Sequence, residues 1–137
     1  MRFLDTNVLV YALLEPRRSL TPVEMKLIAD AKVVLHRIER GEKVLCSVVH
    51  VSEFVNIIQH RKGVVVACEF LNSLIAQENI SIASVERRHY QIALEIAHES
   101  HVSINDCVAV VVMAEHGVSE IYSFDKDFDV LGIKRIT

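Results

Sequence analysis

Four acidic residues lie where carboxylates can do chemistry together: Asp5, Glu53, Asp106 and Asp125. Asp5 and Asp125 each follow a short apolar run that is typical of a buried strand, and Asp106 lies in the first turn of a predicted helix. In open α/β sheets, ligands bind at the carboxyl ends of the strands. Carboxylates gathered there would raise one another's pKa, and a divalent cation would relieve the repulsion. Hard oxygen ligands select Mg²⁺ or Mn²⁺, ions that can clamp the attacking and leaving oxygens of a phosphodiester.

Each of these carboxylates also has a purely structural explanation. Asp5 could cap the helix that follows it. Asp106 could be the second member of a capping box begun by Ser103, and Asp125 could form a turn. Glu53 could be a solvated helix residue, but it lies beside positions that face the core, where a carboxylate without a partner is costly. One shared cation explains all four positions at once.

The apolar runs and helix signals predict strands that alternate with helices. Strands are expected at about 1–4, 43–47, 80–84, 120–124 and 133–136, and helices at about 8–14, 23–40, 48–60, 64–77, 85–99 and 104–116, with a turn at 126–131. Thr21 begins a capping box with Glu24, while Ser47, Ser84 and Ser103 are expected to cap later helices. This alternation predicts a parallel sheet covered on both faces.

The composition is that of one ordered domain over residues 1–137. Hydrophobic residues make up 51% of the chain and charged residues 24%, with only four Gly and two Pro. The net charge of −3 argues against a protein that holds nucleic acid mainly by bulk attraction. Any polyanionic substrate would therefore need metal ions and local basic patches.

The cysteines and the apolar runs predict a cytoplasmic protein. Cys46, Cys68 and Cys107 show no metal-ligand spacing and are expected to be reduced and buried. The longest purely apolar run of the second half, 108–114, is too short to span a membrane. The acidic residue at position 5 interrupts the pattern of a signal peptide.

Four motifs, in their order and spacing, resemble those of the PIN-domain family. They are Met1–Asn7 (MRFLDTN), Ser52–Glu53, Ile104–Asp106 (IND) and Ser123–Phe128 (SFDKDF). The resemblance covers the whole chain, whose size is similar to that of VapC-type toxin ribonucleases of toxin–antitoxin systems. It implies a three-layer α/β/α Rossmann-like sandwich with a central parallel sheet of about five strands. It also implies an endoribonuclease that depends on Mg²⁺ or Mn²⁺ and leaves a 5′-phosphate and a 3′-hydroxyl.

The same resemblance assigns roles to individual residues. Asp5 and Asp106 would be the core metal ligands, with Glu53 and Asp125 completing an acidic quartet. Hydrogen bonds that hold these carboxylates in place would come from Thr6, Asn7, Asn105 and Ser123.

The last acidic motif leaves the identity of one ligand open. Asp125, Asp127 and Asp129 alternate along the chain, so any of them could reach a metal. We favour Asp125, which directly follows the strand, with Asp127 as an auxiliary ligand and Asp129 exposed to solvent.

Two basic pairs are candidates for contacts with RNA. Arg17 and Arg18 follow the first predicted helix, and Arg61 and Lys62 follow the helix that carries Glu53. The alternative is that both pairs are surface charges that keep the protein soluble.

A homodimer and an antitoxin protein are the partners that the resemblance implies, besides the RNA substrate. The predicted helices 8–14 and 23–40 are candidates for the apolar surface that such partners would cover. Two other functions fit the same residues. One is an RNA-processing nuclease without an antitoxin, and the other is a non-catalytic RNA-binding or interaction module that keeps one structural metal ion.

Overall fold

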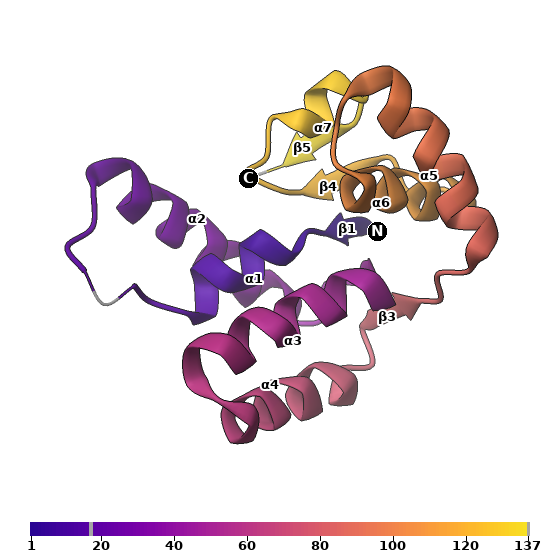
Figure 1. Ribbon diagram of the computed structural model, residues 1–137. Helices are drawn as coiled ribbons and strands as arrows, with labels where there is room; N and C mark the ends of the chain where they lie inside the picture. The colour runs from indigo at the N-terminus through magenta and orange to yellow at the C-terminus, as the bar shows by residue number, and fades with distance from the viewer. Residues whose placement is uncertain (17, 137) are drawn as a thin grey trace.

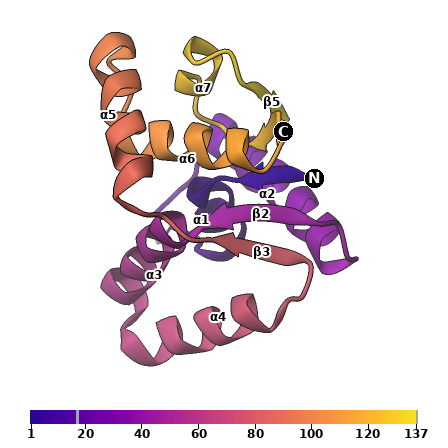
Figure 2. The same cartoon turned by 90° about the vertical axis from the view of Figure 1, so that its right-hand side faces the viewer.

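A computed structural model describes residues 1–16 and 18–136, which form a five-stranded parallel sheet with helices on both faces (Figures 1 and 2). The strands are β1 (Arg2–Leu4), β2 (Val44–Ser47), β3 (Ile80–Ala83), β4 (Glu120–Tyr122) and β5 (Lys134–Ile136). Their order across the sheet is β3-β2-β1-β4-β5, and every neighbouring pair is parallel. The predicted α/β fold with a five-stranded parallel sheet is confirmed.

Seven helices surround the sheet in the described part of the chain. They are α1 (Thr6–Leu13), α2 (Pro22–Glu39), α3 (Val48–Lys62), α4 (Val64–Ala76), α5 (Arg87–Ser100), α6 (Ile104–Glu115) and α7 (Asp127–Val130). Alternate residues of the central strand face opposite layers, as the period of two in a strand requires. Phe3 belongs to the core shared with α5, α6 and α7, whereas Leu4 belongs to the core shared with α1 to α4. None of the helices in residues 1–16 and 18–136 is long and apolar enough to cross a membrane.

Three of the four predicted helix caps are present. Thr21 forms both hydrogen bonds of its capping box with Glu24. The hydroxyls of Ser47 and Ser103 each accept a hydrogen bond from the backbone N–H three residues further on. These local bonds fix where α2, α3 and α6 begin, and therefore which side chains their first turns present.

Three predictions about local structure are wrong. Ser84 does not cap the fifth helix, because α5 begins at Arg87 with Glu86 as its N-cap. The segment 126–131, expected to be a simple turn, contains the short helix α7. Cys46 and Cys107 are buried as predicted, but Cys68 lies on the exposed side of α4. An apolar run of the kind that surrounds Cys68 does not by itself show which side of a helix faces solvent.

The centre of the sheet is also its topological switch point. The chain runs from β1 outward to β2 and β3, then returns to pair β4 with the other edge of β1. Loops that leave β1 and β4 therefore diverge, and this is the place where open α/β sheets bind ligands. Asp5 and Ser123 are the first residues beyond these two strands.

Candidate active site

A polar hollow of about 420 Å³ opens beyond the carboxyl ends of the central strands. It is lined by Asp5, Thr6, Asn7, Glu53, Asn56, Ile57, Ser103, Asn105, Asp106 and Asp125. The structure therefore brings the four predicted carboxylates together from β1, α3, α6 and β4. None of the described residues that line the hollow is Lys, Arg or His, so no side chain there neutralises their charge.

Asp5 is the most deeply buried of the four carboxylates. Its backbone N–H continues the sheet by donating to the carbonyl oxygen of Tyr122, and only 5% of the residue is exposed. The hydroxyl of Ser123 donates a hydrogen bond of 2.6 Å to Oδ2 of Asp5. Burial is the main cause that raises the pKa of Asp5 to about 6, opposed by this hydrogen bond and reinforced by repulsion from the other three carboxylates. A cation in the hollow would reverse this shift.

Glu53 is held from two directions. Nδ2 of Asn105, in the first turn of α6, donates to Oε1 of Glu53 over 2.5 Å. Oγ1 of Thr6, in the first turn of α1, lies 3.3 Å from Oε2 of Glu53 and 3.0 Å from the carbonyl oxygen of His50. The single hydroxyl proton of Thr6 is therefore shared between these two acceptors. Glu53 is thus a positioned carboxylate and not a freely solvated one.

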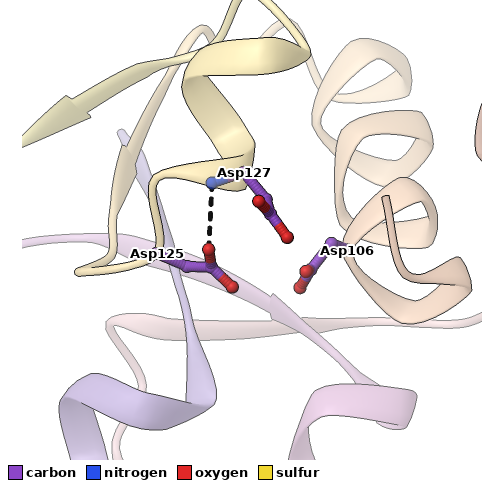
Figure 3. Close-up of side chains that lie close together, drawn as sticks. All are labelled: Asp106, Asp125 and Asp127. Atoms are coloured by element: carbon purple, nitrogen blue, oxygen red, sulfur yellow. Dashed lines mark hydrogen bonds between the residues drawn. The ribbon is translucent and has the colours of Figure 1, made fainter. Parts of the chain in front are cut away.

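Asp106 and Asp125 of the hollow form a close acidic group with Asp127 (Figure 3). One carboxylate oxygen from each residue lies within 4.8 Å of the other two. The backbone N–H of Asp127 donates to Oδ1 of Asp125 over 2.9 Å, so the start of α7 orients Asp125. Burial and then repulsion from neighbouring carboxylates raise the pKa of Asp106. Three oxygens at this spacing can ligate one divalent cation.

The alternating aspartates separate into two environments. Asp125 and Asp127 both contribute to the acidic group, so the structure places the favoured and the auxiliary residue side by side. Asp129 is exposed, as predicted, and its two carboxylate oxygens accept hydrogen bonds of 2.8 and 2.9 Å from Arg135. Asp129 is therefore already paired with a cation from the protein.

Of the predicted basic residues, the three that the structure describes do not line the acidic hollow. Arg18, Arg61 and Lys62 instead line a second hollow with Glu15, Pro16 and His60, where the chain leaves α1 and α3. Arg18 also forms a bidentate pair with Glu24, over 2.9 and 2.6 Å. Arg17 lies outside the described residues.

Three residues of the acidic hollow, Asn56, Ile57 and Ser103, were not predicted to belong to it. Ser103 was expected only as a helix cap, which it is. Asn56 lies three residues after Glu53 on α3 and so shares its side of the helix. That spacing was available in the sequence once Glu53 had been placed in the site.

A family model described as "PIN domain" matches residues 2–134. The chain belongs to the PIN-domain family. No curated protein matches this PIN domain in sequence.

Solved structures similar to this PIN domain include a toxin and a toxin–antitoxin complex. Mycobacterium tuberculosis VapC20, described as a sarcin–ricin-loop-cleaving toxin, is 20% identical with a TM-score of 0.74, covering 97% of this chain and 96% of that one. A toxin–antitoxin complex from Klebsiella pneumoniae is 15% identical with a TM-score of 0.66, and FitAcB from Neisseria gonorrhoeae is 15% identical with a TM-score of 0.64. Both comparisons cover 100% of this chain and 97% of the other. At these identities the likeness is one of fold, and it agrees with the α/β sheet architecture described above.

Proposed function

We propose that this PIN domain is a Mg²⁺- or Mn²⁺-dependent endoribonuclease that acts as the toxin of a type II toxin–antitoxin pair. The observation that carries the proposal is the gathering of carboxylates from four separate elements in one hollow without a cationic side chain. Such an arrangement is unfavourable in isolation and becomes favourable with divalent cations. Membership of the PIN family and the sarcin–ricin-loop-cleaving neighbour support RNA as the substrate.

The residues of the hollow fit a divalent cation. Asp106, Asp125 and Asp127 would each supply one oxygen, and a cation would also offset the repulsion between Asp5 and the other three carboxylates of the hollow. A bound Mg²⁺ or Mn²⁺ would lower the pKa of a water molecule and stabilise negative charge that develops on a phosphate. The set of carboxylate oxygens, without sulfur or imidazole, favours these ions over zinc.

The contribution of the protein itself is to hold the carboxylates in fixed positions. Ser123 holds Asp5 through its hydroxyl, while Asn105 and Thr6 hold the two oxygens of Glu53. Ligands that are already oriented need little rearrangement as charge develops during phosphodiester cleavage. Asn7 also lines the hollow, and we propose for it the same orienting role.

RNA would contact the protein beyond the acidic hollow, at the hollow that contains Arg18, Arg61 and Lys62. Lys62 lies nine residues beyond Glu53 on α3, which corresponds to about 13 Å along the helix axis. The hollow that contains Arg18, Arg61 and Lys62 is therefore close enough to meet phosphates of the same strand. With a net charge of −3, binding would depend on these local contacts and would weaken with salt.

An antitoxin and a second copy of the chain are the proposed protein partners. One similar structure is a toxin–antitoxin complex, which supports an antitoxin here. Of the two helices predicted to supply the apolar surface, α2 exposes Val23, Met25 and Val33, whereas α1 is mostly buried. Light scattering of the purified protein, alone and after co-expression with a partner encoded beside it, tests both associations.

Cleavage assays separate the proposed function from its alternatives. The purified protein should cut RNA with Mg²⁺ or Mn²⁺, and Asp5→Asn should abolish cutting. Cleavage without any growth defect on overexpression would favour the RNA-processing nuclease. A large thermal shift with metal but no cleavage of any RNA would favour the non-catalytic module and contradict the proposal.

A further inference from the structure

A third hollow, of about 330 Å³, adjoins the acidic one on the side of α5. The two share the side chains of Glu53, Asn56 and Asn105. The remaining lining residues are Val48, Val49 and Ser52 of α3 and Tyr90 of α5. We call this third hollow the Tyr90 pocket. A ligand bound at the carboxylates can therefore extend into the Tyr90 pocket without leaving the surface.

The walls of the Tyr90 pocket are those of a site for a flat, partly apolar ring. Tyr90 leaves 42% of its surface exposed and Val48 leaves 44% exposed, so an aromatic ring and an aliphatic side chain face solvent there. Ser52 and Asn56 add a hydroxyl and an amide. Because Nδ2 of Asn105 is already bonded to Glu53, its amide oxygen is the atom left to accept a bond from a ligand.

The position of Tyr90 is fixed by the residue before it. His89 is 2% exposed, and its Nδ1 accepts a hydrogen bond of 2.8 Å from the backbone N–H of Glu86. Nδ1 is therefore unprotonated, and Nε2 donates to Oε2 of Glu115 on α6 over 2.7 Å. These bonds set the rotation of the first turn of α5 against α6. The backbone that carries Tyr90 at the pocket is therefore held in place before a ligand binds.

We propose that the Tyr90 pocket binds an unpaired nucleobase of the RNA, next to the phosphate that lies at the carboxylates. The proposal rests on the ribonuclease function proposed above. Glu53 forms part of the wall, so a phosphate would be repelled there, whereas a neutral base would not. Aromatic side chains bind bases of single-stranded RNA by stacking, and the amides supply contacts to the edge of the base. A base held in a duplex is already stacked and paired and cannot enter.

Fluorescence tests this pocket without any need for cleavage. The chain contains no Trp, so Tyr90→Trp introduces one indole that keeps the stacking surface. In an Asp5→Asn background with Mg²⁺, a single-stranded oligoadenylate of five nucleotides should quench this indole, and an abasic oligomer of the same charge should not. Ile92→Trp is the matched control, since Ile92 is 46% exposed on the same helix and points about 200° away from Tyr90. Equal quenching of both variants, or equal quenching by the abasic oligomer, would overturn the proposal.

The second test compares the KM values of variants in RNA cleavage. Tyr90→Ala removes the stacking ring and should raise KM for unpaired RNA by about 5- to 150-fold, whereas Ile92→Ala should keep the wild-type value. Tyr90→Phe retains the ring and should raise KM less than Tyr90→Ala. The same RNA annealed to its complement should be cut poorly by the wild type. If the wild type cuts no RNA at all, the ribonuclease proposal fails while the fluorescence result still stands. If the wild type cuts RNA and Tyr90→Ala cuts it equally well, only the Tyr90 pocket proposal fails.

Discussion

The hydroxyl of Ser123 donates a 2.6 Å hydrogen bond to the carboxylate of Asp5, although the two residues are 118 positions apart in the chain. They are the first residues beyond β4 and β1, and pairing of these two strands at the centre of the sheet brings them together. Both side chains are buried. The position of Asp5 is thus set by the fold itself, before any cation or substrate binds.

Removal of the Ser123 hydroxyl should destabilise the protein. In Ser123→Ala, Oδ2 of Asp5 loses its donor while it stays buried, so the free energy of unfolding at pH 7 should fall by about 1–3 kcal/mol. Urea unfolding in EDTA measures this change. Ser119→Ala, at an exposed serine just before β4, is the control and should stay within about 0.5 kcal/mol of the wild type. Equal stability of the two variants would show that the hydrogen bond contributes nothing.

The stability of the metal-free protein should depend on the ionisation of Asp5. The pKa of Asp5 is about 6 in the folded protein and 3.8 when unperturbed, so the folded state holds its proton more tightly. The contribution of the Asp5 carboxyl to the free energy of unfolding is fully present below pH 3.8. It is lost as the pH rises through about 6, with a total loss of about 3 kcal/mol.

Comparison with Asp5→Asn isolates this effect, because asparagine does not titrate. In EDTA, the stability of Asp5→Asn relative to the wild type should rise between pH 4 and pH 7. Unfolding free energies from urea titrations at several pH values provide the measurement. Parallel pH profiles for the two proteins would rule out a raised pKa at Asp5.

Much of the fold could be predicted because its signals are local. The caps at Thr21, Ser47 and Ser103 and the apolar runs of the strands each depend on a few neighbouring residues. An acidic residue after each of two central strands was also visible in the sequence, and the topology of the sheet then brings Asp5 and Asp125 together.

The features that could not be predicted depend on contacts between distant elements. The start of α5 at Arg87 follows from the burial of His89 against Glu115, a partner 26 residues away. The Tyr90 pocket requires α3 and α5 to meet, and no local pattern separates a tyrosine at such a pocket from one on an open surface. Asp127 was predicted as an auxiliary ligand, but the short helix α7 that begins at this residue was not, because the sequence suggested only a turn.

Asp127 and Asp129 offer a matched pair for testing which residues hold the metal. Asp127→Asn removes a carboxylate from the acidic group and should weaken Mg²⁺ or Mn²⁺ binding by about tenfold or more. Asp129→Asn removes a carboxylate of the same turn that is bonded to Arg135, so metal binding should be unchanged. Calorimetric titration with each metal distinguishes the two. An effect of Asp129→Asn as large as that of Asp127→Asn would point to general loss of negative charge and not to ligation.

Asn105 should increase the cleavage rate by holding the carboxylate of Glu53 in position. Asn105→Ala removes the 2.5 Å hydrogen bond to Oε1 of Glu53, so the metal-dependent cleavage rate should fall by about 10- to 100-fold. Asn72→Ala, at an exposed asparagine of α4, should leave the rate unchanged. Rates are compared at saturating metal and RNA. Wild-type rates in Asn105→Ala would contradict a positioning role for this amide.

The most direct test of the central claim is the cleavage of end-labelled RNA by the wild type and by Asp106→Asn, each in EDTA and after addition of excess Mn²⁺ or Mg²⁺. The wild type should be inactive in EDTA and should cut when the metal is restored, leaving a 5′-phosphate and a 3′-hydroxyl. Asp106→Asn should be at least about 100-fold slower under the same conditions. Undiminished cutting in EDTA, or by Asp106→Asn with metal, would contradict a carboxylate-held cation as the basis of the activity.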